Sequence, residues 1–308
     1  MYTYTNFFYY IFFIIVGKEE KRNLYTLNEN LIKLHHCRKM SWKTIFTLLK
    51  MDPELHMFYS TSNKKLPLPI AKETMEDFHS TFIQEQISQY KHNGITAITY
   101  FDSRYPKLLK EIYQPPWVLY TKGDASLMNM PKKLAVVGSR LATNYSHQVI
   151  EKLMPDLVQN GIIIASGLAA GVDTLAHKAT MANGGKTIAV IAGGLFQIYP
   201  KQNIPLAREM MKKHLIISEY PPLSKPMKWQ FPMRNRIISG ICNGTLVMEA
   251  KRKSGSLITA NFALNEGRDV FAIPGSIFSP FSVGANELIK AGAKPVLSAE
   301  DILEEWHY

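Results

Sequence analysis

At residues 134–140 the chain reads Leu-Ala-Val-Val-Gly-Ser-Arg, a short apolar run that ends in glycine, serine and arginine. Similar runs recur along the C-terminal two thirds of the chain, and the segments between them are long enough for helices. The runs are Leu134–Val137, Ile162–Ala165, Thr187–Ile191, Leu215–Ile217, Thr245–Met248 and Val270–Ile273. Runs that are apolar throughout are typical of strands buried on both faces. The pattern predicts an α/β fold with a Rossmann-like, doubly wound, mostly parallel sheet.

The residues that follow these runs are mostly small or cationic. Ligands of an open parallel sheet bind beyond the carboxyl ends of its strands. Glycine and serine at these ends let backbone N–H groups approach a phosphate, and arginine or lysine adds positive charge. Taken singly, each stretch is more typical of a turn or a solvated surface, but their convergence predicts a crevice for anions. The candidate residues at the strand ends are Gly138, Ser139, Arg140, Ser166, Gly167, Lys253, Ser254 and Gly255.

Residues 231–240 place two arginines around an asparagine where a helical pattern begins. The start of a helix leaves backbone N–H groups unpaired, and Arg234 and Arg236 add two guanidinium groups there. The segment alone indicates equally an anion clamp or two arginines that pair with acidic neighbours. Its place after the fourth run, among the other candidate strand ends, favours the clamp. Asn235 would then orient a phosphate or a base between the arginines.

Charge and composition narrow the class of partner. The formal net charge is +11 and the isoelectric point is near 9.4, which favours a polyanion, either nucleic acid or a membrane surface. The two cysteines, Cys37 and Cys242, are too few for a disulfide framework and fit a reducing cytoplasm. Asp173 and His177 lack a third ligand, so an ordinary polar pair is favoured over a metal site. Dinucleotide and P-loop motifs are absent, so no cofactor is expected.

The N-terminal third has a different pattern. The apolar run Phe7–Val16 is shorter than the roughly 20 residues of a membrane-spanning helix, and it lacks the flanks of a secretory signal. We interpret residues 1–23 as a non-native or disordered extension, with a weak membrane anchor as the alternative, and expect no stable membrane insertion. Residues 24–92 form a small helical domain with a linker near 63–69, and residues 93–308 form the α/β domain. The stripes that predict its helices are Leu27, Leu31 and Leu34, then Trp42, Ile45, Phe46 and Leu49, then Phe82, Ile83, Ile87 and Tyr90.

The ordered series of strand-end motifs resembles the DNA-processing protein A (DprA/Smf) family, over roughly residues 95 to 300. The helices before it are similar to the small SAM-like domain of many members. They could serve either as a docking module or as a nucleic-acid-binding module. The motifs that carry the resemblance are Val136–Arg140, Ser166–Asp173, Tyr199–Asn203, Ser218–Pro221, Phe231–Gly240, Glu249–Ala250, Ser254–Ala260, Pro274–Gly275, Gly284–Ile289 and Gly292–Ala293.

The resemblance implies a non-catalytic protein that binds single-stranded DNA, protects incoming DNA during natural transformation and loads RecA recombinase. It also implies a cytoplasmic homodimer. The chain stops at Tyr308, so the C-terminal winged helix of some members is not expected. Arg140 and the Arg234-Asn235-Arg236 clamp would lie in the DNA pocket, with Lys253, Ser254, Gly255 and Asn203 as neighbours.

Aromatic side chains near these phosphate contacts are candidates for stacking on bases. Phe231, Trp229 and Phe196 qualify by position, although each is more typical of a core residue. Two loops depart from the family pattern: residues 192–197 lack its usual aspartate, and residues 222–225 lack its common glycine.

An enzyme is the alternative function. Gly244-Thr245 followed by Glu249 resembles the nucleotide site of phosphoribohydrolases, which release a base from a nucleoside monophosphate. The preceding residues 241–243 lack the glycines of that motif, so we expect no enzymatic activity.

Overall fold

The structure, a computed structural model, describes residues 22–59 and 70–306. The chain divides into two compact units. The first holds the described residues up to Tyr105 together with Pro116–Leu119, and the second holds Pro106–Pro115 and the residues from Tyr120 onward. The extension predicted at residues 1–23 and the linker predicted near 63–69 lie outside the described residues, apart from residues 22 and 23.

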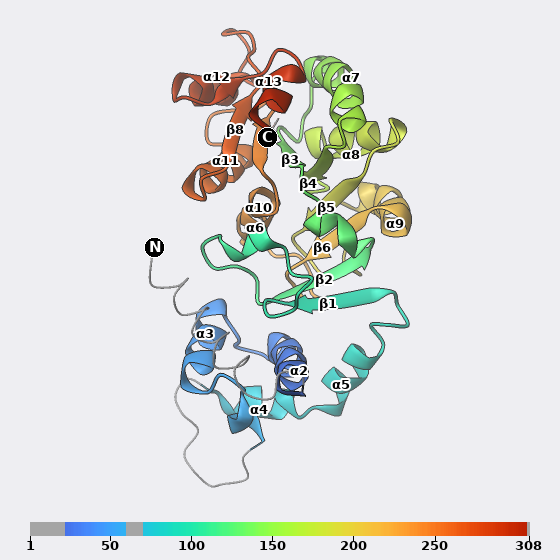
Figure 1. Cartoon of the computed structure of the whole chain (residues 1–308), viewed down its shortest axis with the longest axis vertical. Helices are drawn as coiled ribbons and strands as arrows, with labels where there is room; N and C mark the ends of the chain where they lie inside the picture. The colour runs from blue at the N-terminus through green and yellow to red at the C-terminus, as the bar shows by residue number, and fades with distance from the viewer. Residues whose placement is uncertain (1–21, 60–69, 307–308) are drawn as a thin grey trace. The chain divides into compact units, whose positions relative to one another are not determined.

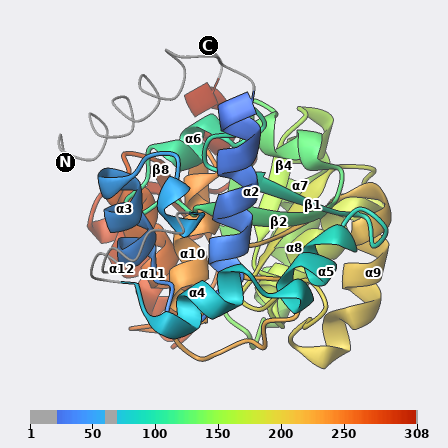
Figure 2. The same ribbon diagram turned by 90° about the horizontal axis from the view of Figure 1, so that it is seen from below.

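The first unit is mainly helical. Its helix α2 packs against α4 and α5 (Figure 2). Two of the predicted apolar stripes supply core residues, because Leu27, Leu31 and Leu34 of α2 and Ile45 and Leu49 of α3 are buried. In the third stripe Ile83 and Tyr90 are buried, but the prediction is wrong for Phe82, which is 64% exposed. The elements of this unit are α2 (Arg22–His36), α3 (Trp42–Met51), the 3-10 turn η1 (His56–Phe58), α4 (Lys72–Phe78), α5 (Thr81–Ser88) and β1 (Ile95–Thr99).

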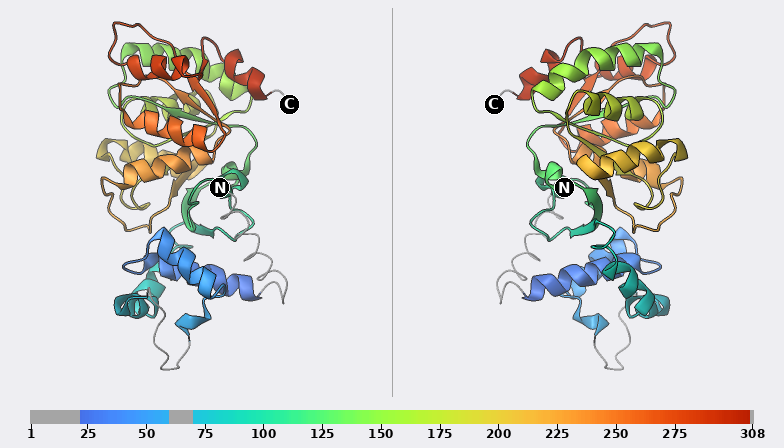
Figure 3. Two further views of the ribbon diagram at one scale, coloured as in Figure 1. Left: turned by 90° about the vertical axis from the view of Figure 1, so that its left-hand side faces the viewer. Right: turned by 90° about the vertical axis from the view of Figure 1, so that its right-hand side faces the viewer.

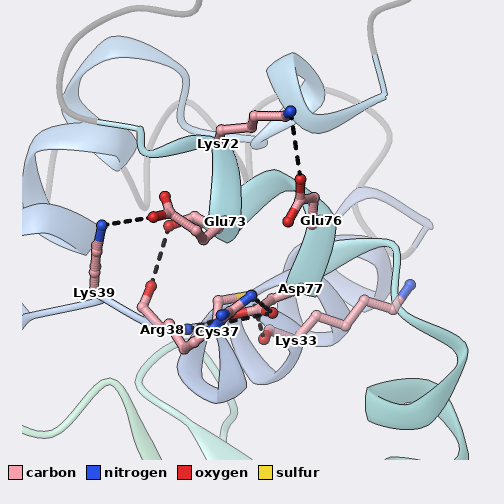
Figure 4. A network of polar contacts seen from close by, with 9 residues as sticks. Lys33, Cys37, Arg38, Lys39, Lys72, Glu73, Glu76 and Asp77 are labelled. Carbon is pink, nitrogen blue, oxygen red and sulfur yellow. Dashed lines mark hydrogen bonds and ion pairs between the residues drawn. The ribbon is translucent and has the colours of Figure 1, made fainter.

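The basic turn between α2 and α3 is held by acidic residues of α4 (Figure 4). The Arg38 guanidinium donates to both carboxylate oxygens of Asp77, with Nη2 2.9 Å from Oδ1, and Lys39 Nζ lies 2.9 Å from Glu73 Oε1. The hydrogen bonds from Arg38 lower the pKa of Asp77. Acidic residues of the same unit therefore neutralise the positive charge of the turn, which supports a structural role for the turn.

The strands form one mixed sheet in the order β1-β2-β6-β5-β4-β3-β7-β8-β9. From β6 to β9 the pairs are parallel, and β2 runs antiparallel to β6. All six predicted runs are strands, so the mostly parallel, doubly wound fold is confirmed. The strands after β1 are β2 (Val118–Gly123), β3 (Lys133–Val137), β4 (Ile163–Ser166), β5 (Thr187–Ile191), β6 (Leu215–Ser218), β7 (Gly244–Val247), β8 (Asp269–Ala272) and β9 (Lys294–Pro295).

Two layers of helices cover this sheet, with α7, α8 and α9 on one face and α10, α11 and α12 on the other (Figures 1 and 3). One hydrophobic core lies between the sheet and the layer of α7, α8 and α9. This core includes Leu153 of α7, Val172 of α8 and Leu303 of α13. The helices are α6 (Lys107–Lys110), α7 (Asn144–Gln159), α8 (Val172–Ala182), α9 (Ile204–Lys213), α10 (Gln230–Gly240), α11 (Gly255–Asn265), α12 (Val283–Lys290) and α13 (Glu300–Leu303), with 3-10 turns η2 (Ala125–Asn129), η3 (Lys201–Asn203) and η4 (Glu304–Trp306).

The order in which the chain adds strands to the sheet reverses between the neighbouring parallel strands β3 and β7, and this reversal positions the site. These strands are neighbours, yet α7 after β3 covers one face and α11 after β7 covers the other. The chain therefore leaves the two carboxyl ends in opposite directions and opens a crevice between them, where ligands of doubly wound sheets bind.

In the part of the chain that the structure describes, no helix has the length and apolar character to cross a lipid bilayer.

Candidate nucleic-acid interface

A groove crosses the carboxyl ends of β3, β4, β5 and β7, and we call it the strand-end groove. Residues that follow β3 and β7 line one part of it, and residues that follow β4 and β5 line the other. Arg140, Ala169, Phe231 and Arg234 line both parts, so the two parts adjoin each other. The predicted site residues along the groove are Gly138, Ser139, Arg140, Gly167, Phe231, Arg234, Asn235, Ser254 and Gly255.

Arg234 is a buried cation on the wall of the groove. Its Nη1 donates to the carbonyl oxygen of Val190 at 2.8 Å, and a Cβ added at Gly167 would lie 1.6 Å from that nitrogen. Only glycine at position 167 permits this approach. Burial lowers the pKa of Arg234 to about 10, and the negative charge of Asp173 opposes the shift, so the group is cationic at neutral pH. Its Nε is buried and has no hydrogen-bond partner among the described residues.

Asp173 organises the loop between β4 and α8. Its Oδ2 accepts hydrogen bonds from the backbone N–H groups of Gly167 at 3.1 Å and Ala169 at 3.3 Å. Burial raises the pKa of this carboxyl, and Arg234 acts against the rise. His177 has a separate partner, because its Nδ1 lies 2.6 Å from Thr187 Oγ1. Within residues 22–59 and 70–306, no group of three or more His, Cys, Asp or Glu could hold a metal ion.

Arg140 and Phe231 form the lip of the groove, where Arg140 is exposed and the Phe231 ring is half-buried. The Arg140 guanidinium carbon lies 5.7 Å from the centroid of the Phe231 ring, and the ring of Tyr199 meets Phe231 edge-on at 5.7 Å. A guanidinium over an aromatic ring is held in place by the ring and keeps N–H donors for a phosphate. This lip therefore combines a cation with a ring on which a base can stack.

The start of α11 forms another part of the groove wall. Ser254 precedes this helix, its Oγ lies 2.8 Å from Ser256 Oγ, and Asn235 Nδ2 donates to the carbonyl oxygen of Gly255 at 3.2 Å. Thr259, one turn further along, lines the groove with a buried hydroxyl that has no hydrogen-bond partner in the described ranges. Unpaired N–H groups at a helix start and nearby hydroxyls are suited to a phosphate.

Arg236 lies away from the groove, although only one residue separates it from Arg234. Its Nη2 forms a buried ion pair with Glu219 Oε1 at 2.5 Å. Because α10 turns about 100° per residue, two arginines two positions apart point in different directions. The clamp predicted from the sequence is therefore divided between a groove residue and a core ion pair. A DNA contact of Arg236 stays a prediction.

Three other candidates, Asn203, Ser166 and Lys253, are not among the residues that line the groove. Asn203 is buried and its Nδ2 donates to Leu168 O and Thr174 Oγ1, each at 2.8 Å, which fixes the β4–α8 loop. Ser166 Oγ donates to the carbonyl oxygen of Val136 at 2.6 Å and ties β4 to β3. Lys253 is exposed at a turn with φ +59°. Their contacts with DNA also stay predictions.

Several groove residues have no role that is predictable from the sequence. In the sequence, Tyr199 and Pro200 belong to a family motif but have no feature of their own that indicates binding. Pro226 has no such feature either, because a proline between a lysine and a methionine is an ordinary loop residue. They reach the groove because the loops after β5 and β6 fold over its end.

Glu249, the residue that carried the enzyme alternative, caps α7. Its Oε2 accepts from Thr143 N–H at 2.9 Å and from Ser146 Oγ at 2.6 Å, and its Oε1 accepts from Thr143 Oγ1 at 2.8 Å. The side chain is buried and both oxygens are hydrogen-bonded. This arrangement is typical of a capping carboxylate near a helix start.

Comparisons with known proteins show the family of the chain. The family model described as DNA recombination-mediator protein A matches residues 96–307. The DNA processing protein DprA of Bacillus subtilis (strain 168) is 44% identical over 260 residues, which cover 83% of this chain and 87% of that protein. The DprA of Streptococcus pneumoniae is 49% identical over 212 residues, which cover 69% of this chain and 74% of that protein.

Solved structures give the same result. The X-ray structure of DNA processing protein A from Streptococcus pneumoniae matches with a TM-score of 0.75 at 39% identity, and covers 94% of this chain and 98% of that chain. A structure that concerns the single-stranded DNA binding mode of DNA processing protein A from Helicobacter pylori matches with a TM-score of 0.63 at 30% identity, over 69% of this chain and 95% of that one. The chain therefore belongs to the DNA processing protein A (DprA/Smf) family.

Proposed function

We propose that this chain binds single-stranded DNA in the strand-end groove without sequence preference. The observation that carries the proposal is the combination of the exposed Arg140 on the Phe231 ring with the buried cation Arg234 in one groove. A positive groove with a stacking ring is the usual architecture of single-strand binders. The single-stranded DNA binding of the Helicobacter pylori relative supports it.

The groove chemistry favours sequence-independent binding. Guanidinium groups, helix-start N–H groups and serine hydroxyls bind phosphates, which are the same in every nucleotide. An aromatic face accepts any base. A duplex hides its base faces, so a groove that uses Phe231 for stacking prefers a single strand.

The wider role that we propose is protection of incoming DNA and loading of RecA recombinase during natural transformation, by a cytoplasmic homodimer. The family description as a recombination mediator supports the loading role. Cys37 and Cys242 are free and buried, which fits a reducing compartment. If the role is right, adding the protein accelerates RecA assembly on single-stranded DNA. An unchanged rate of assembly, measured by RecA ATP hydrolysis on that DNA, would contradict loading.

The variant Arg140→Ala tests the groove. We expect its dissociation constant for single-stranded DNA to rise about tenfold, similarly for all sequences, because a charge-assisted hydrogen bond to phosphate is lost. The slope of log K against log salt should fall by about 0.7, the value for one phosphate of a single strand. Fluorescence anisotropy with labelled oligonucleotides at several salt concentrations measures both quantities.

Lys212→Ala is the matched control. Lys212 is exposed in the last turn of α9, outside the groove lining, and its removal changes the net charge by the same amount. We expect nearly unchanged affinity. Equal losses in the two variants would show an effect of net charge alone and would refute the groove as the binding site.

A further inference from the structure

A surface of exposed apolar side chains lies on the two loops that follow β5 and β6. We call it the aromatic ledge, and it consists of Phe196, Leu223, Met227 and Trp229. Trp229 is 59% exposed and Phe196 is 45% exposed, although their sequence context was typical of core residues. Large aromatic rings that stay exposed on a loop are a reason to look for a binding partner.

The two loops form one hydrogen-bonded unit. The backbone N–H of Gly194 donates to Ser224 O at 2.8 Å, and that of Phe196 donates to Pro222 O at 2.9 Å. A Cβ at Gly194 would lie 2.1 Å from the carbonyl oxygen of Pro221, so glycine is required for this approach. The Trp229 ring also contacts Tyr220 at the beginning of the second loop, with 5.9 Å between ring centroids. The ledge is therefore held by its own backbone.

The ledge continues the strand-end groove. Gly193, Tyr199 and Pro226 line the groove and belong to the same two loops as the ledge residues. Pro226 lies directly before Met227 in the chain, and a Cβ added at Gly193 would lie 3.0 Å from Pro226 Cδ, so the two loops approach closely at this point. Pro226 therefore belongs to the groove lining and directly precedes a residue of the ledge.

The charge around the ledge suits a polyanion. Residues 192–208 and 220–248 contain no aspartate or glutamate, while they include Lys201, Lys225 and Lys228. These three lysines are exposed, and none takes part in the ion pairs formed between the described residues. Rings among uncompensated lysines are typical of surfaces that stack bases and hold phosphates.

We propose that the aromatic ledge is a second part of the single-stranded-DNA site, in which Trp229 stacks on a base of the strand that leaves the groove. Lys225 and Lys228 bind the adjoining phosphates. The inference rests on the proposed function, because it assigns the path of the same DNA beyond the groove.

Two variants at position 229 test the stacking. In Trp229→Ala, the dissociation constant for an oligonucleotide of about 16 nucleotides should rise about 5- to 150-fold, since a base loses its aromatic partner. In Trp229→Phe, stacking persists, so affinity should stay near that of the wild type. DNA-induced quenching of tryptophan fluorescence should largely disappear in Trp229→Phe, which reports the contact directly.

Length and location controls separate the ledge from the groove. An oligonucleotide of about 4 nucleotides fits one part of such a site, so Trp229→Ala should bind it like the wild type, whereas Arg140→Ala should weaken both lengths. Leu264→Ala removes a similarly exposed apolar side chain at the end of α11, outside the groove lining, and should change the affinity for neither length.

The proposal is overturned if Trp229→Ala binds the longer oligonucleotide as the wild type does while Arg140→Ala is weakened. That result would leave the groove in place and make the ledge a surface for another protein. Equal losses for both lengths in Trp229→Ala would also overturn it, because they would show an effect on the groove or on the fold. Unchanged binding in Arg140→Ala would instead contradict the proposed function.

Discussion

Replacing Glu219 by leucine should lower the free energy of unfolding by about 3–5 kcal/mol, the cost of leaving one partner of a buried ion pair uncompensated. The side chains of Arg236 and Glu219 are only 6% and 11% exposed, so water cannot replace the lost carboxylate. Arg236 Nε and Nη1 already lack partners among the described residues, which increases the dependence of this guanidinium on Glu219. Urea unfolding followed by circular dichroism measures the change.

An exposed ion pair of the same length provides the control. Arg252 Nη2 and Glu287 Oε1 are also 2.5 Å apart, but the side chains are 70% and 44% exposed. Glu287→Leu should cost at most about 1 kcal/mol, because solvent screens exposed pairs. A similar loss of stability in both variants would contradict the role assigned to burial.

The double variant Arg236→Met with Glu219→Leu separates stability from DNA binding. Apolar residues in place of a buried ion pair are often neutral or stabilising, so much of the stability lost in Glu219→Leu should return. If the double variant stayed as unstable as Glu219→Leu, the unpaired charge would not be the cause. A folded double variant with wild-type affinity would show that Arg236 is no DNA contact, and weakened binding would support the contact predicted from the sequence.

Gly171→Ala is the second variant with a large expected effect. Gly171 has φ +76° and ψ −129°, which disfavours any side chain, and an added Cβ would lie 2.3 Å from the carbonyl oxygen of Ser139. Strain and overpacking together should cost about 2–4 kcal/mol. The collision also displaces the backbone of Arg140, so DNA affinity should fall even where the protein remains folded. Urea unfolding and fluorescence anisotropy measure the two effects.

Gly184→Ala is the control for a positive φ without a collision. Gly184 has nearly the same φ, +75°, but an added Cβ would meet no atom within 4 Å. It therefore carries the cost of the backbone conformation alone, about 1 kcal/mol, and should leave DNA affinity unchanged. If Gly171→Ala were no worse than Gly184→Ala, the close approach to Ser139 would have no energetic importance.

The sequence predicted those parts of the fold that depend on local pattern. Continuous apolar runs located six buried strands, and the residues after them include most of the groove lining. The strand β2 was not recognised, because it directly follows the turn signal of Pro115-Pro116, and β9 has only two residues.

The environment of single side chains was harder to predict. Their spacing in the sequence predicted that Arg234 and Arg236 act together. Residues two positions apart in the helix α10 point in different directions, so the two side chains have different surroundings. Trp229 and Phe196 were expected in the core, since large aromatic residues are usually buried. Their exposure follows from the pairing between two loops that are distant in sequence, which a local pattern does not encode.

Because Arg234 is buried, its guanidinium loses its water during folding and not during DNA binding. A lysine on the surface must release its water when it meets a phosphate, whereas Arg234 has already exchanged water for the carbonyl oxygen of Val190 during folding. Its guanidinium therefore needs little reorganisation at the moment of encounter. Mobile ions in solution also screen a buried charge weakly. The groove therefore holds one attraction that persists at ionic strengths at which its exposed cations are largely neutralised.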